Sequence, residues 1–312
     1  MHVVNHFLKV HRLEESFTLL DMACLFMRNS SDPKNVIPRK RNNSVSVSVA
    51  QSTICAEQLM CLALALGLRK LTANLLMLID SDAPDFIRKS RTGWRRFRSS
   101  YRQFKSFIDV NPMPSIASVS SMMMILSELR DIDVARLKVL PHVRAALPVK
   151  SCQLIASATH LIDEFDSIAI ELRYAVRSIL SDVQLSQTIW ELTLWTLSFL
   201  KTNELPENSI KSLDFKEWSH QSISELYRKY IHSKGKSQNP TDRHRTRIHA
   251  KRLRYAIENL YPVVDFDVQD LYQTACRAQG KLGDEHDWMT TELLAEKYGH
   301  SSLSKLIRHL AC

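Results

Sequence analysis

The feature that most constrains the fold of this chain is a match between two basic windows, residues 88–102 and 243–254. Each window holds at least six Lys and Arg residues and no Asp or Glu. A shift of 156 residues, without a gap, lays five positions of one window on the other: Arg88 on His244, Arg91 on Arg247, Arg95 on Lys251, Arg96 on Arg252 and Arg98 on Arg254. The same shift carries Leu126, Arg130 and Asp131 onto Leu282, His286 and Asp287. A repeat this long predicts two similar helical bundles in tandem, packed about a pseudo-twofold axis, rather than a solenoid of short repeats.

Residues that break helices are scarce, with only 6 glycines and 10 prolines among 312 residues. Long helices are therefore favoured over a turn-rich β fold, and the 45% hydrophobic content suffices for a buried core. We predict an all-α fold of roughly eight to ten helices. Breaks are expected near residues 81–84, 111–114, 141–148, 205–209 and 234–240.

The first 50 residues differ in character from the rest, because a short amphipathic stretch is followed by a segment rich in Ser, Asn, Pro and basic residues. This composition predicts a weakly ordered leader over residues 1–50. The helical domain is then expected to cover residues 51–312. Its first bundle would span about residues 51–150 and its second about residues 151–312.

Several classes of protein are disfavoured. The six cysteines include no Cys-x-x-Cys pair, which suits neither a disulfide scaffold nor a zinc site and favours a reducing compartment. Glu14, Glu15 and Asp21 interrupt the N-terminal segment, so no signal peptide is expected. Polar and charged residues interrupt the longest apolar stretch, residues 55–79, which predicts a buried helix rather than a membrane span. We therefore expect a cytoplasmic protein.

Each basic window forms a stripe on a helix, because residues advance by about 100° and positions 0, 3, 7 and 10 share one narrow face. The first stripe contains Arg88, Arg91, Arg95, Arg98 and Arg102, with aromatic residues on the opposite side. The second contains His244, Arg247, Lys251 and Arg254. Solvated helix faces normally mix charges of both signs, since like charges at this spacing are mildly destabilising. Two such faces predict a compensating anion, and the planar fork of Arg suits phosphate oxygens.

The length of a stripe, about 15 Å, favours a chain-like anion over a single phosphate. Inorganic polyphosphate is the leading candidate. Nucleic acid is second, because the aromatic residues face the core, Tyr255 excepted, and cannot stack on bases. No glycine loop typical of nucleotide sites is present. A third alternative, a metal-dependent polyphosphate or triphosphate hydrolase, would need an acidic cluster facing the basic stripes.

These residues resemble the conserved histidine α-helical domain family, known as CHAD. The second half is similar through residues 243–258, Gln279, Leu282-Gly283 and His286-Asp287, and the first half through Arg91, residues 95–98 and residues 130–134. The resemblance implies two four-helix bundles around a basic groove or channel that binds polyphosphate, with no reaction of its own. One departure is that Arg88 stands where the first-half motif carries a histidine. This argues against a phosphohistidine relay or a metal pair built from two histidines.

The predicted site is non-catalytic, with no metal and no cofactor. Its polyphosphate-binding residues are Arg88, Lys89, Arg91, Arg95, Arg96, Arg98, Arg102, His244, Arg247, Lys251, Arg252, Arg254, Tyr255 and His286. His244 is interpreted either as a phosphate donor or as a histidine bonded to a neighbour at the start of a helix. Asp131, Asp133, Asp284 and Asp287 are expected to hold guanidinium groups by ion pairs rather than to bind metal or catalyse. Weaker contacts are expected from Lys229, His232, Lys234 and Lys236, in a cytoplasmic protein associated with polyphosphate granules.

Overall fold

The structure is a computed structural model that describes residues 12–25, 56–108, 112–200, 212–236 and 239–311. Within these ranges the chain is helical and contains no strand, so the predicted all-α class is confirmed. After a helix over residues 12–25, the elements are α2 (Ala56–Asp80), α3 (Pro84–Gln103), α4 (Lys105–Ile108), α5 (Ala117–Val134), the π-helical turn η1 (Ala135–Val139), α6 (Leu140–Ala146), α7 (Cys152–Leu180), α8 (Val183–Ser198), α9 (Ser212–Gly235), α10 (Pro240–Leu260), α11 (Gln269–Lys297) and α12 (Ser301–Leu310).

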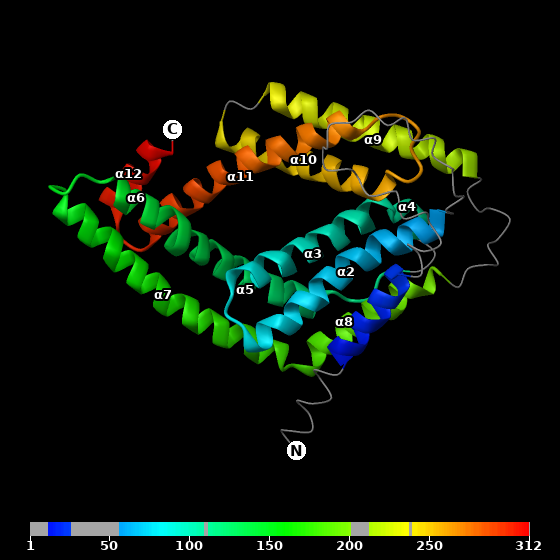
Figure 1. The fold of residues 1–312 in the computed structure, drawn as a ribbon, viewed down its shortest axis with the longest axis horizontal. Helices are drawn as coiled ribbons and strands as arrows, with labels where there is room; N and C mark the ends of the chain where they lie inside the picture. The colour runs from blue at the N-terminus through cyan, green and yellow to red at the C-terminus, as the bar shows by residue number, and fades with distance from the viewer. Residues whose placement is uncertain (1–11, 26–55, 109–111, 201–211, 237–238, 312) are drawn as a thin grey trace, which may run out of the picture.

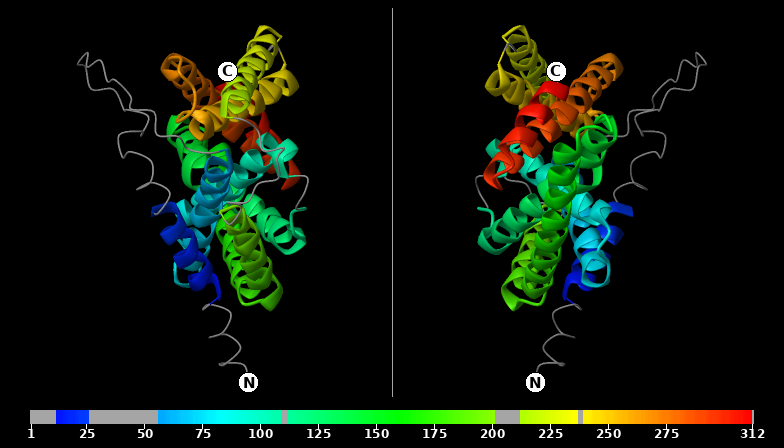
Figure 2. Two further views of the ribbon diagram at one scale, coloured as in Figure 1. Left: turned by 90° about the vertical axis from the view of Figure 1, so that its right-hand side faces the viewer. Right: turned by 90° about the vertical axis from the view of Figure 1, so that its left-hand side faces the viewer.

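The helices form two groups that meet along α3 and α5 (Figure 1). α2, α3, α5, α7 and α8 pack together on one side, and α9, α10 and α11 lie on the other (Figures 1 and 2). α3 contacts α10, and α5 contacts α11, so these four helices form the junction between the groups. The short α12 follows α11 and packs on α7.

Among the described helices, α2 and α3 make the most extensive contact with each other. A Cβ atom added to Gly67 would lie 2.6 Å from the backbone nitrogen of Phe97, and one added to Gly93 would lie 2.5 Å from that of Leu71. Only glycine therefore permits the two backbones to approach this closely. Trp94 stacks on Phe97 with ring centroids 5.4 Å apart, and both rings are buried on the side of α3 that faces the core.

Among the described residues, one helix is long and apolar enough to cross a membrane, namely α2, with half of its most apolar window buried inside the fold. Its buried residues include Leu64, Leu68, Leu71 and Leu75, and it contacts α3 and α8. The sequence predicted that this stretch forms a core helix, and the packing shown here agrees with that interpretation.

Residues 12–25 differ from the expectation of a weakly ordered leader, because they form a helix that packs into the common core. Leu13 and Leu20 are fully buried, and Cys24 is nearly so. An ion pair between Asp21 and Arg69 joins this helix to α2. The apolar spacing within the stretch was sufficient for one buried helix face. The remainder of residues 1–50 lies outside the described residues.

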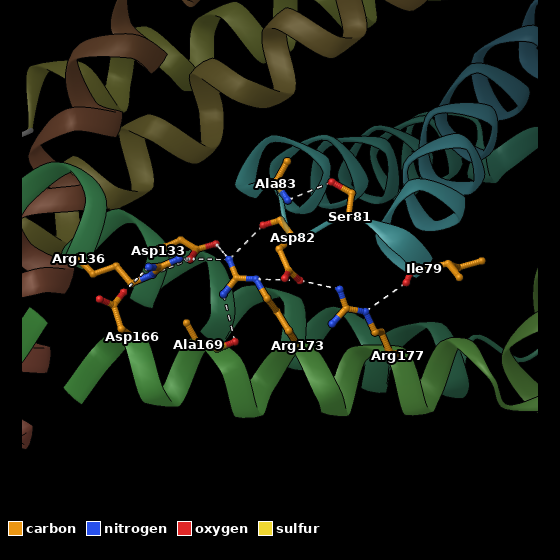
Figure 3. A network of polar contacts seen from close by, with 10 residues as sticks. All are labelled: Ile79, Ser81, Asp82, Ala83, Asp133, Arg136, Asp166, Ala169, Arg173 and Arg177. Atoms are coloured by element: carbon orange, nitrogen blue, oxygen red, sulfur yellow. Dashed lines mark hydrogen bonds and ion pairs between the residues drawn. The ribbon is translucent and has the colours of Figure 1, made fainter. Parts of the chain in front are cut away.

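A buried ion-pair network fixes the end of α5 against α7 (Figure 3). The Asp133 carboxylate has no solvent exposure and accepts hydrogen bonds from Arg136 at 2.9 and 3.0 Å and from Arg173 at 3.0 and 3.2 Å. Arg173 also donates to the Asp82 backbone carbonyl at 3.3 Å, and Arg177 donates to the Asp82 carboxylate at 2.7 Å. Asp133 thus holds guanidinium groups, as expected, but not those of the basic stripes.

Candidate functional site

The two predicted basic stripes lie on α3 and α10, the helices that meet at the junction. Both helices begin with a proline in the first turn, which lacks the N–H that would be unpaired there. Asn239 caps α10 by accepting a hydrogen bond from the Asp242 N–H at 2.8 Å. Trp94 and Phe97 of α3 and Leu253 of α10 are buried in the core. The charged residues on the other faces of these two helices are therefore turned toward the junction.

Five of these side chains form a half-buried group that we call the basic cluster: Arg91, Arg95, Arg247, Lys251 and Arg254. Burial lowers the pKa of Arg91 to about 10, with Arg95 and Arg247 among the cations that add to the effect. Burial and neighbouring cations also lower the pKa values of Arg95 and Arg247. These mutual shifts show that α3 and α10 bring like charges close together at the junction.

Lys251 has the largest lowering of pKa that is resolved within the basic cluster. Its pKa falls from 10.5 to about 7, first because the amine is buried and then because Arg95, Arg247 and Arg91 repel its charge. A lysine in this setting gains charge readily when an anion arrives, because the anion favours the protonated amine. Lys251 is therefore poised to exchange a proton near neutral pH.

Hydrogen-bonding capacity is left over around the basic cluster. The buried Nε atoms of Arg96 and Arg247 have no hydrogen-bond partner within the described structure. Buried donors are normally paired, so each unpaired one calls for an explanation. A bound anion would satisfy them and offset the repulsion at the same time.

Acidic groups approach the cluster without neutralising it. Asp131 lies 3.8 Å from Arg91, measured between carboxylate oxygen and guanidinium nitrogen. Burial raises the pKa of Asp131, with the Arg91 charge opposing this effect. Asp284 and Asp287 bind the Lys138 amine of η1 at 2.7 and 3.0 Å. As expected, these carboxylates form ion pairs, although the partner of the latter two is a lysine rather than an arginine.

His244 and His286 lie side by side at one end of the basic cluster, with ring centroids 5.8 Å apart. Burial, followed by the charge of Arg247, lowers the pKa of His286 to about 4 and also lowers that of His244. Both rings are therefore neutral at pH 7, and each can donate one N–H to an anion without adding charge.

Arg254 of the basic cluster has an aromatic and an acidic neighbour on its own helix. The Arg254 guanidinium lies 4.7 Å from the centroid of the Tyr255 ring, and Glu258 lies 3.5 Å from Arg254 and 3.7 Å from Arg96. Burial lowers the pKa of Arg254, but the negative charge of Glu258 opposes this effect, and the pKa of Arg254 is raised overall. Tyr255 itself is only 4% exposed, so it supports Arg254 from beneath rather than facing a ligand.

The remaining predicted residues lie outside the basic cluster. Arg88 and Lys89 both pair with Asp85 on their own helix. Arg98, Arg102 and Arg252 are exposed at the far end of the junction. Arg102 and Arg252 line a pocket of about 420 Å³ together with Trp218 and Glu225 of α9. Lys229, His232 and Lys234 lie within α9, and Lys229 pairs with Glu225 at 2.6 Å.

Two cations near the site were missed by the sequence-based prediction. Arg130 lowers the pKa values of Arg91 and Arg95, and the 156-residue offset that relates it to His286 could have indicated it. Burial lowers the pKa of half-buried Lys70 of α2, and the nearby Arg96, Arg88 and Arg254 lower it further. No sequence pattern marks Lys70, because only the packing of α2 places it there.

The comparisons with known proteins agree with this architecture. The family model of the CHAD domain matches residues 62–296, which is most of the chain. The chain belongs to the CHAD domain family. The fold of this CHAD protein is similar to the crystal structure of the CHAD domain from the plant Ricinus communis, with a TM-score of 0.67 and 19% sequence identity over 88% of this chain and 91% of that chain. No curated protein matches the chain.

Proposed function

We propose that this CHAD protein binds inorganic polyphosphate non-catalytically across the junction of α3 and α10. The observation that carries the proposal is the basic cluster itself, in which burial and mutual repulsion lower the pKa values of Arg91, Arg95, Arg247 and Lys251 together. Such a cluster is unfavourable in the free protein and is stabilised by a polyanion. The exposed Arg98, Arg102 and Arg252 would extend the contact to a chain longer than one phosphate.

The proposal includes an internal duplication with a pseudo-twofold relation around a basic groove. In support, α9 begins 156 residues after α2, and α10 begins 156 residues after α3, which is the offset of the sequence repeat. Residues related by this offset also interact with each other: Asn259 donates a hydrogen bond to Gln103 at 2.8 Å, and Arg95 acts on Lys251. Contacts between equivalent positions are typical of a twofold axis.

Polyphosphate is favoured over nucleic acid because the aromatic side chains that neighbour the basic cluster in the sequence are buried. Trp94, Phe97 and Tyr255 are all at most 4% exposed. Binding of single strands without sequence preference normally uses exposed rings on which the bases stack. The cluster instead offers guanidinium and ammonium groups alone, which match a chain of phosphates without bases.

The test is a competition between long-chain polyphosphate, single-stranded DNA and double-stranded DNA at one fixed salt concentration. Arg247→Glu should weaken polyphosphate binding at least tenfold, because it reverses a charge inside the basic cluster. Arg245→Glu is the matched control, since Arg245 lies two residues away on the same helix and is 64% exposed. Equal losses in the two variants, or tighter binding of either DNA than of polyphosphate, would contradict the proposal.

We further propose that the protein has no hydrolytic activity and acts in the cytoplasm, at polyphosphate granules. The absence of hydrolysis is supported by the carboxylates near the basic cluster, because Asp284 and Asp287 form ion pairs with Lys138 and Asp131 forms one with Arg91. Incubation with magnesium and long-chain polyphosphate should release no phosphate above the background. Release that disappears in an Asp131→Asn variant would identify an enzyme instead.

A further inference from the structure

A second group of functional side chains lies away from the basic cluster, where α12 packs on α7. His160, Glu164 and His300 each place a ligand atom within 4.8 Å of the other two. His160 and Glu164 are one turn apart on α7 and therefore share a face. The His160 and His300 rings have centroids 5.6 Å apart. Two imidazoles and a carboxylate thus converge from two separate elements.

The backbone around His300 is fixed by a turn between α11 and α12. Gly299 adopts a positive φ of 82°. The His300 N–H donates to the Ala295 carbonyl at 2.8 Å, and the Gly299 N–H donates to the Glu296 carbonyl at 3.1 Å. These two bonds define a Schellman motif, which terminates α11 and sets the direction of the chain. Tyr298 adds an edge-to-face contact with Phe165 of α7 at 5.3 Å, so the turn is anchored one residue from Glu164.

The ring of His300 is oriented as well as placed. Its Nδ1 atom lies 2.6 Å from the Ser157 hydroxyl oxygen on α7. When Nδ1 donates to this hydroxyl, the lone pair on Nε2 is available to a metal. Histidines that bind metals usually have such a partner on their other ring nitrogen, which fixes the tautomer and the ring orientation.

We propose that His160, Glu164 and His300 bind one divalent first-row transition metal ion, represented by Zn²⁺, which joins α12 to α7. Imidazole nitrogen and carboxylate oxygen suit such ions, whereas Ca²⁺ and Mg²⁺ prefer oxygen ligands alone. Ligand atoms around a tetrahedral zinc ion lie roughly 3.3 Å apart, so small side-chain rotations of His160 and Glu164 close the site. The fourth position is left for water.

The direct test is calorimetric titration of the full, chelator-treated chain with Zn²⁺. One ion per chain should bind, and the thermal midpoint should rise with zinc concentration. His160→Ala should lower the affinity at least a hundredfold while the fold remains intact, because His160 is exposed on α7. Ser157→Ala should lower it about 10- to 100-fold through the loss of the ring partner. His309→Ala, also exposed on α12, is the matched control and should bind zinc as the unaltered chain does.

The competing location is the His244–His286 pair at one end of the basic cluster, which also offers two imidazoles. Loss of zinc binding in His286→Ala, with binding retained in His160→Ala, would overturn the proposal. Failure of the folded chain to bind Zn²⁺ in the micromolar range would overturn it as well. Circular dichroism of each variant separates loss of the site from loss of the fold.

Discussion

Lys251 provides the most specific prediction, namely that polyphosphate binding takes up a proton above pH 7. A pKa lowered from 10.5 to about 7 corresponds to about 5 kcal/mol of unfavourable free energy for the protonated amine, and partial solvent access makes this an upper limit. A bound polyanion favours the charged amine and raises its pKa again. The affinity should therefore fall by up to tenfold per pH unit between about pH 7.5 and 9.5, since one proton enters with the ligand.

The free energy of unfolding of the ligand-free protein should depend on pH in the opposite direction from the polyphosphate affinity. Between pH 7 and 10.5 the unfolded chain holds a proton on Lys251 that the folded chain has released, so the free energy of unfolding rises with pH in this window. Below pH 7 Lys251 is protonated in both states, so the pH dependence disappears while the full cost of the buried charge remains. Urea denaturation across the pH series, without phosphate in the buffer, measures the effect.

Calorimetry in two buffers of different ionisation enthalpy at pH 8.5 measures the proton uptake directly, and we expect nearly one proton per site. Lys251→Arg is the control, because arginine remains charged throughout this range. The affinity of this variant for polyphosphate should therefore not change with pH. Identical pH profiles for the unaltered chain and Lys251→Arg, or no proton uptake at pH 8.5, would refute the assignment.

Three further predictions concern salt and stability. Log affinity for polyphosphate should fall linearly with log salt with a slope of about 4 to 5 for six cationic contacts, and a slope near one would indicate a compact anion site. Arg173→Met should destabilise the fold by about 1.5 to 3 kcal/mol in urea melts because it removes hydrogen bonds to buried Asp133, which retains Arg136, and a loss below 1 kcal/mol would show the network to be dispensable. Leu20→Ala should cost about 2 to 5 kcal/mol by the same measurement if the helix over residues 12–25 belongs to the core, whereas the exposed Met22→Ala should be nearly neutral.

Sequence reasoning reached the helical class and several helix boundaries, because these depend on local chemistry. Breaks were expected near residues 81–84 and 234–240, and the structure begins α3 at Pro84 and α10 at Pro240. The break between α7 and α8 was missed, since Ser181 and Asp182 include neither glycine nor proline. Asp182 starts α8 by capping the Gln184 N–H at 2.9 Å, a weaker signal in a sequence than a breaker.

The limits of the site prediction arise from packing between helices. A helical wheel placed Tyr255 away from the core of its own helix, but α10 contacts α3, α9 and α11, and these neighbours bury the ring. Arg88 fits the stripe by spacing, yet Asp85 three residues earlier binds it. The proposed metal ligands were not indicated by spacing, because His160 and His300 are 140 residues apart and meet only through the turn at Gly299.

The contact between Gly67 and Gly93 determines how the anion-binding face tolerates mutation. Gly93 lies between Arg91 and Arg95, and at this point the backbone of α3 packs directly on the backbone of α2. The position of these two charges relative to α10 is therefore set by contact between backbones rather than by the fit of side chains. Changes of shape elsewhere in the apolar side chains of α2 can be absorbed by local repacking. A single methyl group at either glycine would instead act as a wedge, tilting α3 and moving one row of charge relative to the other without altering any charged residue.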